Sequence, residues 1–384
     1  MYKKFFMGIA AMAALTLVSC SSDDLDSFSD NSSKNEAISF DGYLGRSAVA
    51  VNGSRGSVET KETLKTEGFG VFGKYTDGQT SDPNFFKNPK VTYSGTKWTY
   101  SPLKYWPTQG KIDFLAYAPY DKNKTLNNTS FDFTVADKAA DQIDLLWANA
   151  TGKITEKFEG TTKEKVKFQF KHALSRLGYT VKLSGNYSSS DATFTLKKIT
   201  LAGSPDENTK AFYTKGTIDL SKTGSKEDLS KTNTTTGLWT ATSSADNKQN
   251  FTWFDASYTV TSSTASHPTA PDSKSDYLFV IPQDFSEKIG DAGHQTENPD
   301  KLYVIVEYDV TYKSGTPSTT ITNTVYKKLP IKFEQGKAYM LNLTIGLPIE
   351  FDVDVDTATG VENWEEVNGV PGNIDSWDDI NRKK

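Results

Sequence analysis

Cysteine is nearly absent from this chain, with Cys20 as the single one among 384 residues. An intramolecular disulfide is therefore excluded, and no cysteine nucleophile can act in the part that follows residue 20. A chain of this length without cross-links needs a large buried core and internal hydrogen bonds for its stability. At roughly 100 to 200 residues for each domain, the length predicts two or three domains.

Histidines and catalytic signatures are also scarce. His172, His267 and His294 lie far apart, and the chain contains no His-Glu-x-x-His, Gly-x-Ser-x-Gly or phosphate-loop pattern. We therefore expect no enzyme activity and no cofactor, with a surface hydrolase that uses unmarked carboxylates as the alternative. The formal net charge of -5 argues against nucleic acid as a partner, because nucleic acids select a basic face.

Long apolar runs are confined to the N-terminus. Two lysines precede an apolar run over residues 5–18, which is shorter than the roughly 20 residues that a membrane-spanning helix needs. The run ends in Leu17-Val18-Ser19-Cys20, which resembles a bacterial lipobox. We predict a signal peptide at residues 1–19 and a lipid on Cys20. The alternative is a signal peptide that ends near a chance cysteine.

Residues 20–36 consist mainly of Ser, Asp and Asn, with few apolar side chains. Such a segment cannot offset the entropy lost on ordering, so we predict a flexible, lipidated tether. Its first residues, Ser21-Ser22-Asp23-Asp24, resemble the acidic signals that direct some Gram-negative lipoproteins to the cell surface. The sequence therefore predicts a surface-exposed lipoprotein of the cell outer membrane.

The rest of the chain shows short alternating runs that are rich in β-branched and aromatic residues and are separated by turn residues. Examples are 166–170, 179–183, 193–196, 303–308 and 339–345. This pattern predicts an all-β fold. Residues 171–176 are the one short helical candidate, and the polar stretches 221–250 and 261–275 are expected to be surface loops.

Two motifs resemble ligand sites. Gly68-Phe-Gly-Val-Phe-Gly73 matches the dinucleotide fingerprint, but that fingerprint needs a helix after it, and here a strand end and a turn follow. We interpret it as a glycine-spaced aromatic strand. Asp352, Asp354 and Asp356 resemble a calcium loop, but Thr357 and Asn363 occupy the positions that need Gly and Glu. An acidic strand face is expected, with a different oxygen-ligand site as the alternative, so no metal is predicted.

Aromatic residues crowd one short segment. Trp98, Tyr100, Tyr105 and Trp106 could stack on sugar rings if they were exposed. We favour core packing, because aromatic side chains supply most of the buried area in small β domains. The alternative function is that of a monomeric surface lipoprotein that binds glycans through exposed aromatic residues.

A series of ordered segments resembles the fimbrillin-like proteins, the subunits of the type V pili of Gram-negative anaerobes. The segments are 68–72, Trp98-Thr-Tyr-Ser-Pro102, Tyr105-Trp-Pro107, Phe114-Leu-Ala-Tyr-Ala-Pro119, Asp144-Leu-Leu-Trp-Ala148, Phe170-Lys-His-Ala-Leu-Ser175, Tyr277-Leu-Phe-Val-Ile-Pro-Gln283 and 336–343. The resemblance covers roughly residues 38 to 364.

The resemblance implies a fold, a function and partners. It implies two transthyretin-like β-sandwich domains in tandem, which we place at 37–175 and 176–364, with a C-terminal tail at 365–384 that has no assigned role. It also implies a structural or adhesive subunit of a fimbria that contacts other fimbrial subunits and surface ligands of the host or of bacteria. In that family a protease cuts after an arginine near the first strand, and a strand of a neighbouring subunit fills the groove that is left.

The sequence offers candidates for both parts of that process. Ile38, Phe40 and Leu44 alternate along a possible first strand that ends at Arg46, and Arg55 follows shortly. Only four of the 43 basic residues are arginines, so two in this short window are candidate processing sites. Their position could also be chance.

A long alternating run lies near the other end of the chain. Apolar residues occupy every second position from Leu341 to Val355, with a break expected near Gly346 or Pro348. The second half is the candidate donor strand: Leu347, Ile349, Phe351, Val353 and Val355. An ordinary core strand is the alternative, and it is favoured for the first half of the run.

Overall fold

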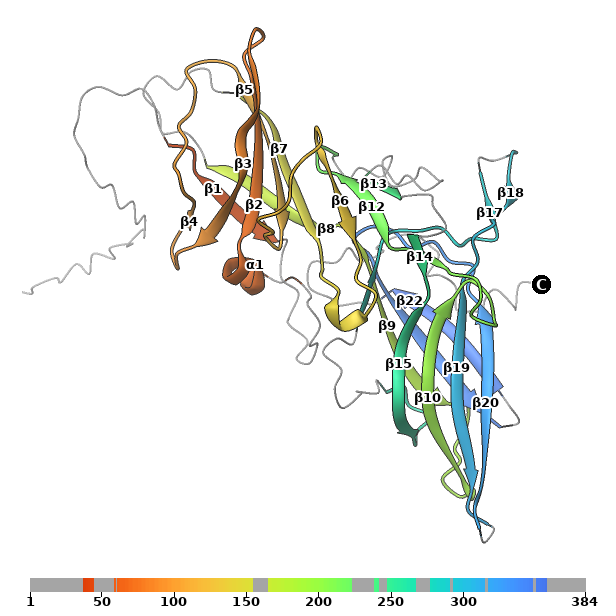
Figure 1. Ribbon diagram of the computed structural model, residues 1–384. Helices are drawn as coiled ribbons and strands as arrows, with labels where there is room; N and C mark the ends of the chain where they lie inside the picture. Colours follow the sequence, from red (N-terminus) through yellow and green to blue (C-terminus); the bar gives the residue numbers. More distant parts are fainter. Residues whose placement is uncertain are drawn as a thin grey trace, which may run out of the picture. The chain divides into compact units, whose positions relative to one another are not determined.

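A computed structural model describes residues 37–44, 59, 61–154, 165–222, 238–241, 247–266, 277–290, 293–314, 317–347 and 350–357. The described chain is built almost entirely of strands, which confirms the predicted all-β fold (Figure 1). The predicted signal peptide, the tether with Cys20, both candidate arginines, Ile349 and the C-terminal tail lie outside these residues.

The N-terminal half contains a seven-stranded sheet. In sheet order its strands are β1 (Phe40–Leu44), β8 (Val166–His172), β7 (Leu146–Ile154), β5 (Lys111–Ala118), β2 (Phe69–Thr76), β3 (Ser81–Tyr93) and β4 (Trp98–Thr99). β1 pairs with β8 in parallel, and the other neighbours are antiparallel. The sheet curls, because its two edge strands β1 and β4 contact one another.

Two four-stranded sheets form most of the C-terminal half (Figure 1). The first has the order β15 (Phe251–Val260), β10 (Ala192–Ala202), β19 (Tyr303–Tyr312) and β20 (Thr319–Lys328). The second has the order β16 (Leu278–Val280), β9 (Ser175–Leu183), β21 (Ala338–Gly346) and β22 (Glu350–Thr357). Inward-facing apolar side chains of both sheets share one core, as in a β-sandwich.

Smaller elements complete the described fold. A three-stranded sheet joins β13 (Trp239–Ala241), β12 (Lys215–Asp219) and β6 (Ser130–Thr134). Two-stranded pairs join β11 (Phe212–Tyr213) to β14 (Lys248–Gln249) and β17 (Lys288–Ile289) to β18 (Thr296–Glu297). The helical elements are α1 (Lys61–Glu67) and a 3-10 turn, η1 (Ala139–Asp141).

The buried apolar side chains form two clusters. The first lies within the seven-stranded sheet and includes Ile38, Phe40 and Phe168. The second extends from Phe72 and Tyr117 of that sheet to the C-terminal sheets. β6, which precedes residue 175, pairs with β12, which follows it. The domain boundary predicted at residue 175 therefore has strand pairing across it, and its position stays a prediction.

The glycine-spaced segment is a strand, as predicted, and packing explains its glycines. A Cβ on Gly70 would lie 2.4 Å from Cε1 of Tyr117 and 2.5 Å from Oδ1 of Asn88. A Cβ on Gly73 would lie 2.9 Å from the ring of Phe86. These glycines let buried side chains approach the backbone of β2.

Two local expectations were wrong. Residues 171–176 form no helix; they end β8 and begin β9, with Ala173 and Leu174 fully buried between them. The polar stretch 221–250 contains β13, where Leu238 and Trp239 are each 1% exposed. The short helix α1 carried no recognised sequence signal.

Candidate functional site

β1 is an edge strand whose inward side chains belong to the first core. Ile38, Phe40 and Leu44 are 1 to 2% exposed, which confirms the predicted alternation, whereas Tyr43 faces outward and is 41% exposed. Just before the strand, the N–H of Ile38 donates to the carbonyl of Lys104 at 2.8 Å. β1 is therefore attached by its ladder to β8 and by one end to the segment after β4.

The ring of Phe40 is the aromatic centre of this attachment. It lies 5.2 to 5.6 Å, between ring centroids, from four other rings: Phe86, Tyr100, Phe114 and Phe168. Edge-to-face and stacked ring pairs of this kind add about 0.5 to 1.5 kcal/mol each beyond the area they bury. Through this one side chain, β1 thus completes a group of five packed rings in the first core.

The aromatic segment after β3 serves this core. Tyr100 is 9% exposed and Trp106 5% exposed, while Tyr105 is 51% exposed. The hydroxyl of Tyr100 donates to the carbonyl of Ile38 at 2.8 Å, so this side chain also anchors β1. Core packing is confirmed for two of the four residues, and Trp98 is half-buried against Phe69.

A buried polar cluster lies where the chain re-enters the described fold after the candidate arginines. The backbone N–H of Glu59 donates to Oδ2 of Asp144 at 2.9 Å. The Nδ1 atom of His172 lies 2.9 Å from Oδ1 of the same carboxylate. Glu59, Asp144 and His172 are 4%, 0% and 2% exposed. The carboxylate of Asp144 therefore joins three segments that are distant in sequence.

The side chain of Glu59 is held in its acid form. Burial, aided by the nearby carboxylates of Glu67 and Asp144, raises the pKa of its carboxyl to about 8. A hydrogen bond from the Thr63 hydroxyl, at 2.8 Å, opposes this shift. At neutral pH the cluster thus contains a protonated carboxyl, which avoids a second buried negative charge beside Asp144.

The alternating C-terminal run forms a hairpin. Leu341, Leu343 and Ile345 lie in β21, which is paired on both sides, so the expected core strand is confirmed for the first half. β22 is the edge strand of that sheet, with Val353 and Val355 buried. Leu347 and Phe351 are partly buried against the same core. The donor role of residues 347–355 stays a prediction.

The acidic residues of β22 have partners on neighbouring strands. Asp352 forms an ion pair with Lys327 of β20, and Asp356 accepts a hydrogen bond from Nδ2 of Asn342 at 2.9 Å. Among the described residues, no group of three or more His, Cys, Asp or Glu side chains could hold a metal ion. His294 lies in an exposed loop, and His267 lies outside the described residues.

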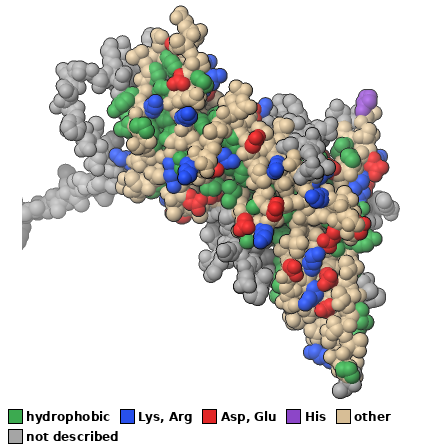
Figure 2. Space-filling view, viewed as in Figure 1, with side chains coloured by type: hydrophobic (Ala, Val, Ile, Leu, Met, Phe, Trp, Pro, Cys, Tyr) green, Lys and Arg blue, Asp and Glu red, His purple; other side chains and the backbone are tan. Residues whose placement is uncertain are grey.

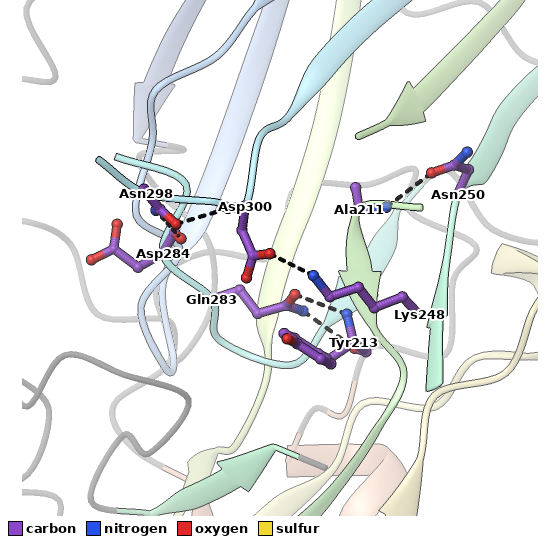
Figure 3. Close-up of polar contacts among 8 residues, drawn as sticks. All are labelled: Ala211, Tyr213, Lys248, Asn250, Gln283, Asp284, Asn298 and Asp300. Carbon is purple, nitrogen blue, oxygen red and sulfur yellow. Dashed lines mark hydrogen bonds and ion pairs between the residues drawn. The ribbon is translucent and has the colours of Figure 1, made fainter. Parts of the chain in front are cut away.

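A second polar network fixes the irregular segment around residues 281–300 (Figure 3). The side-chain amide of Gln283 bonds the backbone of Tyr213 as a neighbouring strand would. It accepts from the N–H of Tyr213 at 2.8 Å and donates to the carbonyl of Tyr213 at 3.2 Å. The Nζ atom of Lys248 lies over the ring of Tyr213 and donates to Oδ1 of Asp300 at 2.5 Å. Asn298 donates to the carbonyl of Asp284 at 2.8 Å. These groups satisfy one another, so the network supports the fold.

The visible surface carries mixed charges. On the face drawn in Figure 2, acidic and basic side chains of the described residues are interspersed, and no extended basic stripe is visible there. Among the described helices, none is long and apolar enough to cross a membrane.

Sequence reasoning missed the cluster of Glu59, Asp144 and His172. Asp144 and His172 lie in two of the segments that carry the family resemblance, and this was the available signal. Glu59 gave no signal, because its partner Asp144 lies 85 residues away. Arg46 and Arg55 lie outside the described residues, between β1 and Glu59.

Comparisons with known proteins agree on one family. The model of the fimbrillin-like family matches residues 57–364. The fimbrium subunit Fim1C of Phocaeicola vulgatus is 28% identical over 416 aligned positions, which cover 98% of each chain. The crystal structure of a fimbrial protein from Bacteroides vulgatus has the same fold, with a TM-score of 0.60 and 22% identity over 85% of this chain and 99% of that one. This chain belongs to the fimbrillin-like family.

Proposed function

We propose that this protein is a lipid-anchored structural or adhesive subunit of a surface fimbria, joined to a neighbouring subunit when a strand of that neighbour replaces β1. The observation that carries the proposal is the position of β1. It is a five-residue edge strand, yet it inserts an aromatic ring that packs against four other rings of the first core. Its removal would expose a strand edge and an apolar surface together, and such surfaces bind extended segments.

The connection from β1 to the rest of the fold supports removal by proteolysis. The next described residue after β1 is Glu59, which is anchored to Asp144 by its backbone. A cut after Arg46 or Arg55 separates β1 from this anchor and leaves α1 and the sheet attached. The hydrogen bond from the Glu59 N–H to Asp144 is buried and has a charged acceptor, and such a bond contributes about 1.5 to 3 kcal/mol to stability.

Membrane attachment is the second part of the proposal. We propose that the lipid on Cys20 places the protein at the outer surface of the outer membrane before assembly. A single acyl chain gives only reversible binding, so stable anchoring requires more than one chain on the N-terminal cysteine. Glycan binding is less favoured as a function, because Tyr100 and Trp106 are buried.

An arginine-specific protease tests the assembly step. Of the four arginines, Arg176 is 3% exposed within β9, so cleavage in the folded protein should concentrate at the N-terminal pair and near Arg382. Trimming should remove β1 and yield ladders of oligomers on a native gel. The double variant Arg46→Ala, Arg55→Ala should stay monomeric under the same treatment. Equal oligomerisation of parent and variant would reject the proposed strand exchange.

A further inference from the structure

We infer that the β1-binding site, meaning the side chains that contact Phe40 and Gly42 of β1, accepts only a strand that carries glycine at the position of Gly42. The required pattern is a large aromatic residue, any residue, glycine, any residue and a large aliphatic residue. This inference rests on the proposed function, because it specifies which strand can replace β1.

A Cβ added to Gly42 would point into the core. Phe40 and Leu44, two residues to either side, point inward and are each 2% exposed. In the parallel ladder Gly42 is opposite Phe168 of β8. A Cβ on Gly42 would lie 2.8 Å from Cε1 of Phe69 and 3.3 Å from Cε2 of Phe170. The first separation is shorter than a carbon–carbon contact allows, so the site excludes every side chain here.

Space is the reason for glycine at this position. Gly42 is not among the glycines with positive φ, so other residues could adopt its backbone conformation. The ring of Phe69 closes the space, and that ring is itself fixed. It is fully buried and packs against Trp98 at 4.9 Å, Phe170 at 5.1 Å and Phe168 at 5.8 Å between centroids.

The site has room for large side chains at the positions two residues before and two residues after Gly42. The space filled by Phe40 admits a complete aromatic ring among four others, and the space filled by Leu44 admits a branched side chain. In strand addition the backbone ladder supplies affinity, while the spaces for alternate side chains supply specificity. The sequence of sizes, large then none then large, is therefore a selective feature of this site.

This feature bears on the identity of the partner. The candidate donor run of residues 347–355 contains no glycine and has an apolar side chain at every second position. Every register of that run that spans the site places Leu, Ile, Phe, Val, Pro or an acid at the position of Gly42. A second copy of this chain that offers this run does not fit. The occupant that fits this site is thus an extended segment with the β1-like pattern, and the 347–355 run of a second copy is excluded.

The test uses the full chain with its own β1 weakened. In a Gly42→Val chain, β1 should leave its site and a fluorescent peptide of residues 37–45 should bind in its place. The same peptide with Gly42→Val should bind about 10- to 100-fold more weakly, the range that overpacking of a core produces. A peptide with Tyr43→Val is the matched control and should bind within about threefold of the parent peptide, because position 43 faces solvent. A peptide of residues 347–355 should not bind.

Compensation at Phe69 completes the test. In a chain that carries both Gly42→Val and Phe69→Leu, the two peptides should bind with affinities within about threefold of each other, and the chain should recover part of the thermal stability lost by Gly42→Val alone. Equal binding of both peptides before compensation would overturn the inference, as would an unchanged stability of Gly42→Val or a failure of any peptide to bind. If the peptides behave as expected but protease-trimmed parent does not oligomerise, the proposed function fails and the size selection stands.

Discussion

The Nδ1 atom of His172 lies 2.9 Å from Oδ1 of Asp144, and neither side chain is exposed to solvent. The other carboxylate oxygen of Asp144 accepts the backbone N–H of Glu59. One buried carboxylate therefore connects the segment after β1, the segment before β7 and the end of β8. Buried pairs of this kind contribute little net stability, but loss of one partner is costly because it leaves polar groups uncompensated.

Asp144→Ala should reduce the free energy of unfolding by about 3 to 5 kcal/mol, because it removes the acceptor for both the Glu59 N–H and the His172 ring. Urea denaturation measures this loss. Asp141→Ala is the control, since Asp141 is exposed in η1. That variant should stay within about 0.5 kcal/mol of the parent. A loss of similar size in both variants would show that the connection has no special role.

Glu59→Gln should remove part of the dependence of stability on pH. In the unfolded chain this carboxyl ionises near 4.5, whereas in the folded protein burial raises its pKa to about 8. The folded state keeps the proton that the unfolded state loses, so stability falls as the pH rises from 4.5 to 8. Between pH 5.5 and 7.5 the parent should lose about 2 to 3 kcal/mol more than the Gln variant.

The control for this effect lies three residues further along the chain. Glu62 is exposed in α1 and pairs with Lys65 at 3.1 Å. Glu62→Gln should leave the slope of stability against pH unchanged, because the carboxylate is solvated in both states. Chemical denaturation at the two pH values measures all three proteins. Parallel slopes for the parent and Glu59→Gln would contradict the assignment of a buried acid.

Gly70→Ala should destabilise the protein by about 1 to 3 kcal/mol, because the new Cβ would collide with Tyr117 and Asn88 inside the sheet. Gly185→Ala is the matched control. Gly185 has ordinary φ and its nearest neighbours, atoms of Tyr187, lie 3.8 Å from the added Cβ. Thermal melts should therefore separate the two variants by several degrees. Equal melting temperatures would mean that β2 can shift away from Tyr117.

Alternation was sufficient to predict β1, β21 and β22, because side-chain direction in a strand has a period of two and is a local property. The false helix at residues 171–176 shows the limit of local reasoning. There the N–H of Ala173 donates to the carbonyl of Leu145, and the carbonyl of Leu174 accepts from Gly336. These backbone groups are satisfied by distant segments, and tertiary pairing overrides helix propensity.

The same limit applies to the site and to β13. Trp239 lies in a stretch of Ser, Thr and Lys, yet its indole N–H donates to the carbonyl of Ala173 at 2.6 Å. Glu59 reaches Asp144 across 85 residues. α1 has seven residues and one buried side chain, Leu64, which is too little to produce a helical period. Contacts of this kind arise from the packing of whole sheets and have no spacing in the sequence.

Cys20→Ala should abolish lipid attachment and membrane retention. The proposal assigns the anchor to the only thiol in the chain, so no second cysteine can replace it. Labelling of cells with a fatty-acid analogue, followed by membrane sedimentation, measures both properties. Ser19→Ala, which changes the neighbouring residue to another small one, is the control and should keep the label. A labelled Cys20→Ala protein that sediments with membranes would contradict the proposed anchor.

Phe40→Ala should loosen β1 and speed proteolytic cleavage after the arginines that follow it. The substitution removes a fully buried ring from contact with Phe86, Tyr100, Phe114 and Phe168, which should cost about 3 to 5 kcal/mol. Because β1 pairs with β8 alone in its ladder, that loss should appear as local release of the strand before global unfolding.

Two readouts follow that release. Cleavage after Arg46 or Arg55 should become faster in Phe40→Ala, and amide exchange should increase in β1 while β2 and β5 stay protected. Tyr43→Ala changes a side chain of similar size on the same strand that is 41% exposed, so it should leave both readouts close to those of the parent. If Tyr43→Ala releases β1 as readily as Phe40→Ala, the strand is held by its backbone ladder, and the aromatic centre is not what keeps it in place.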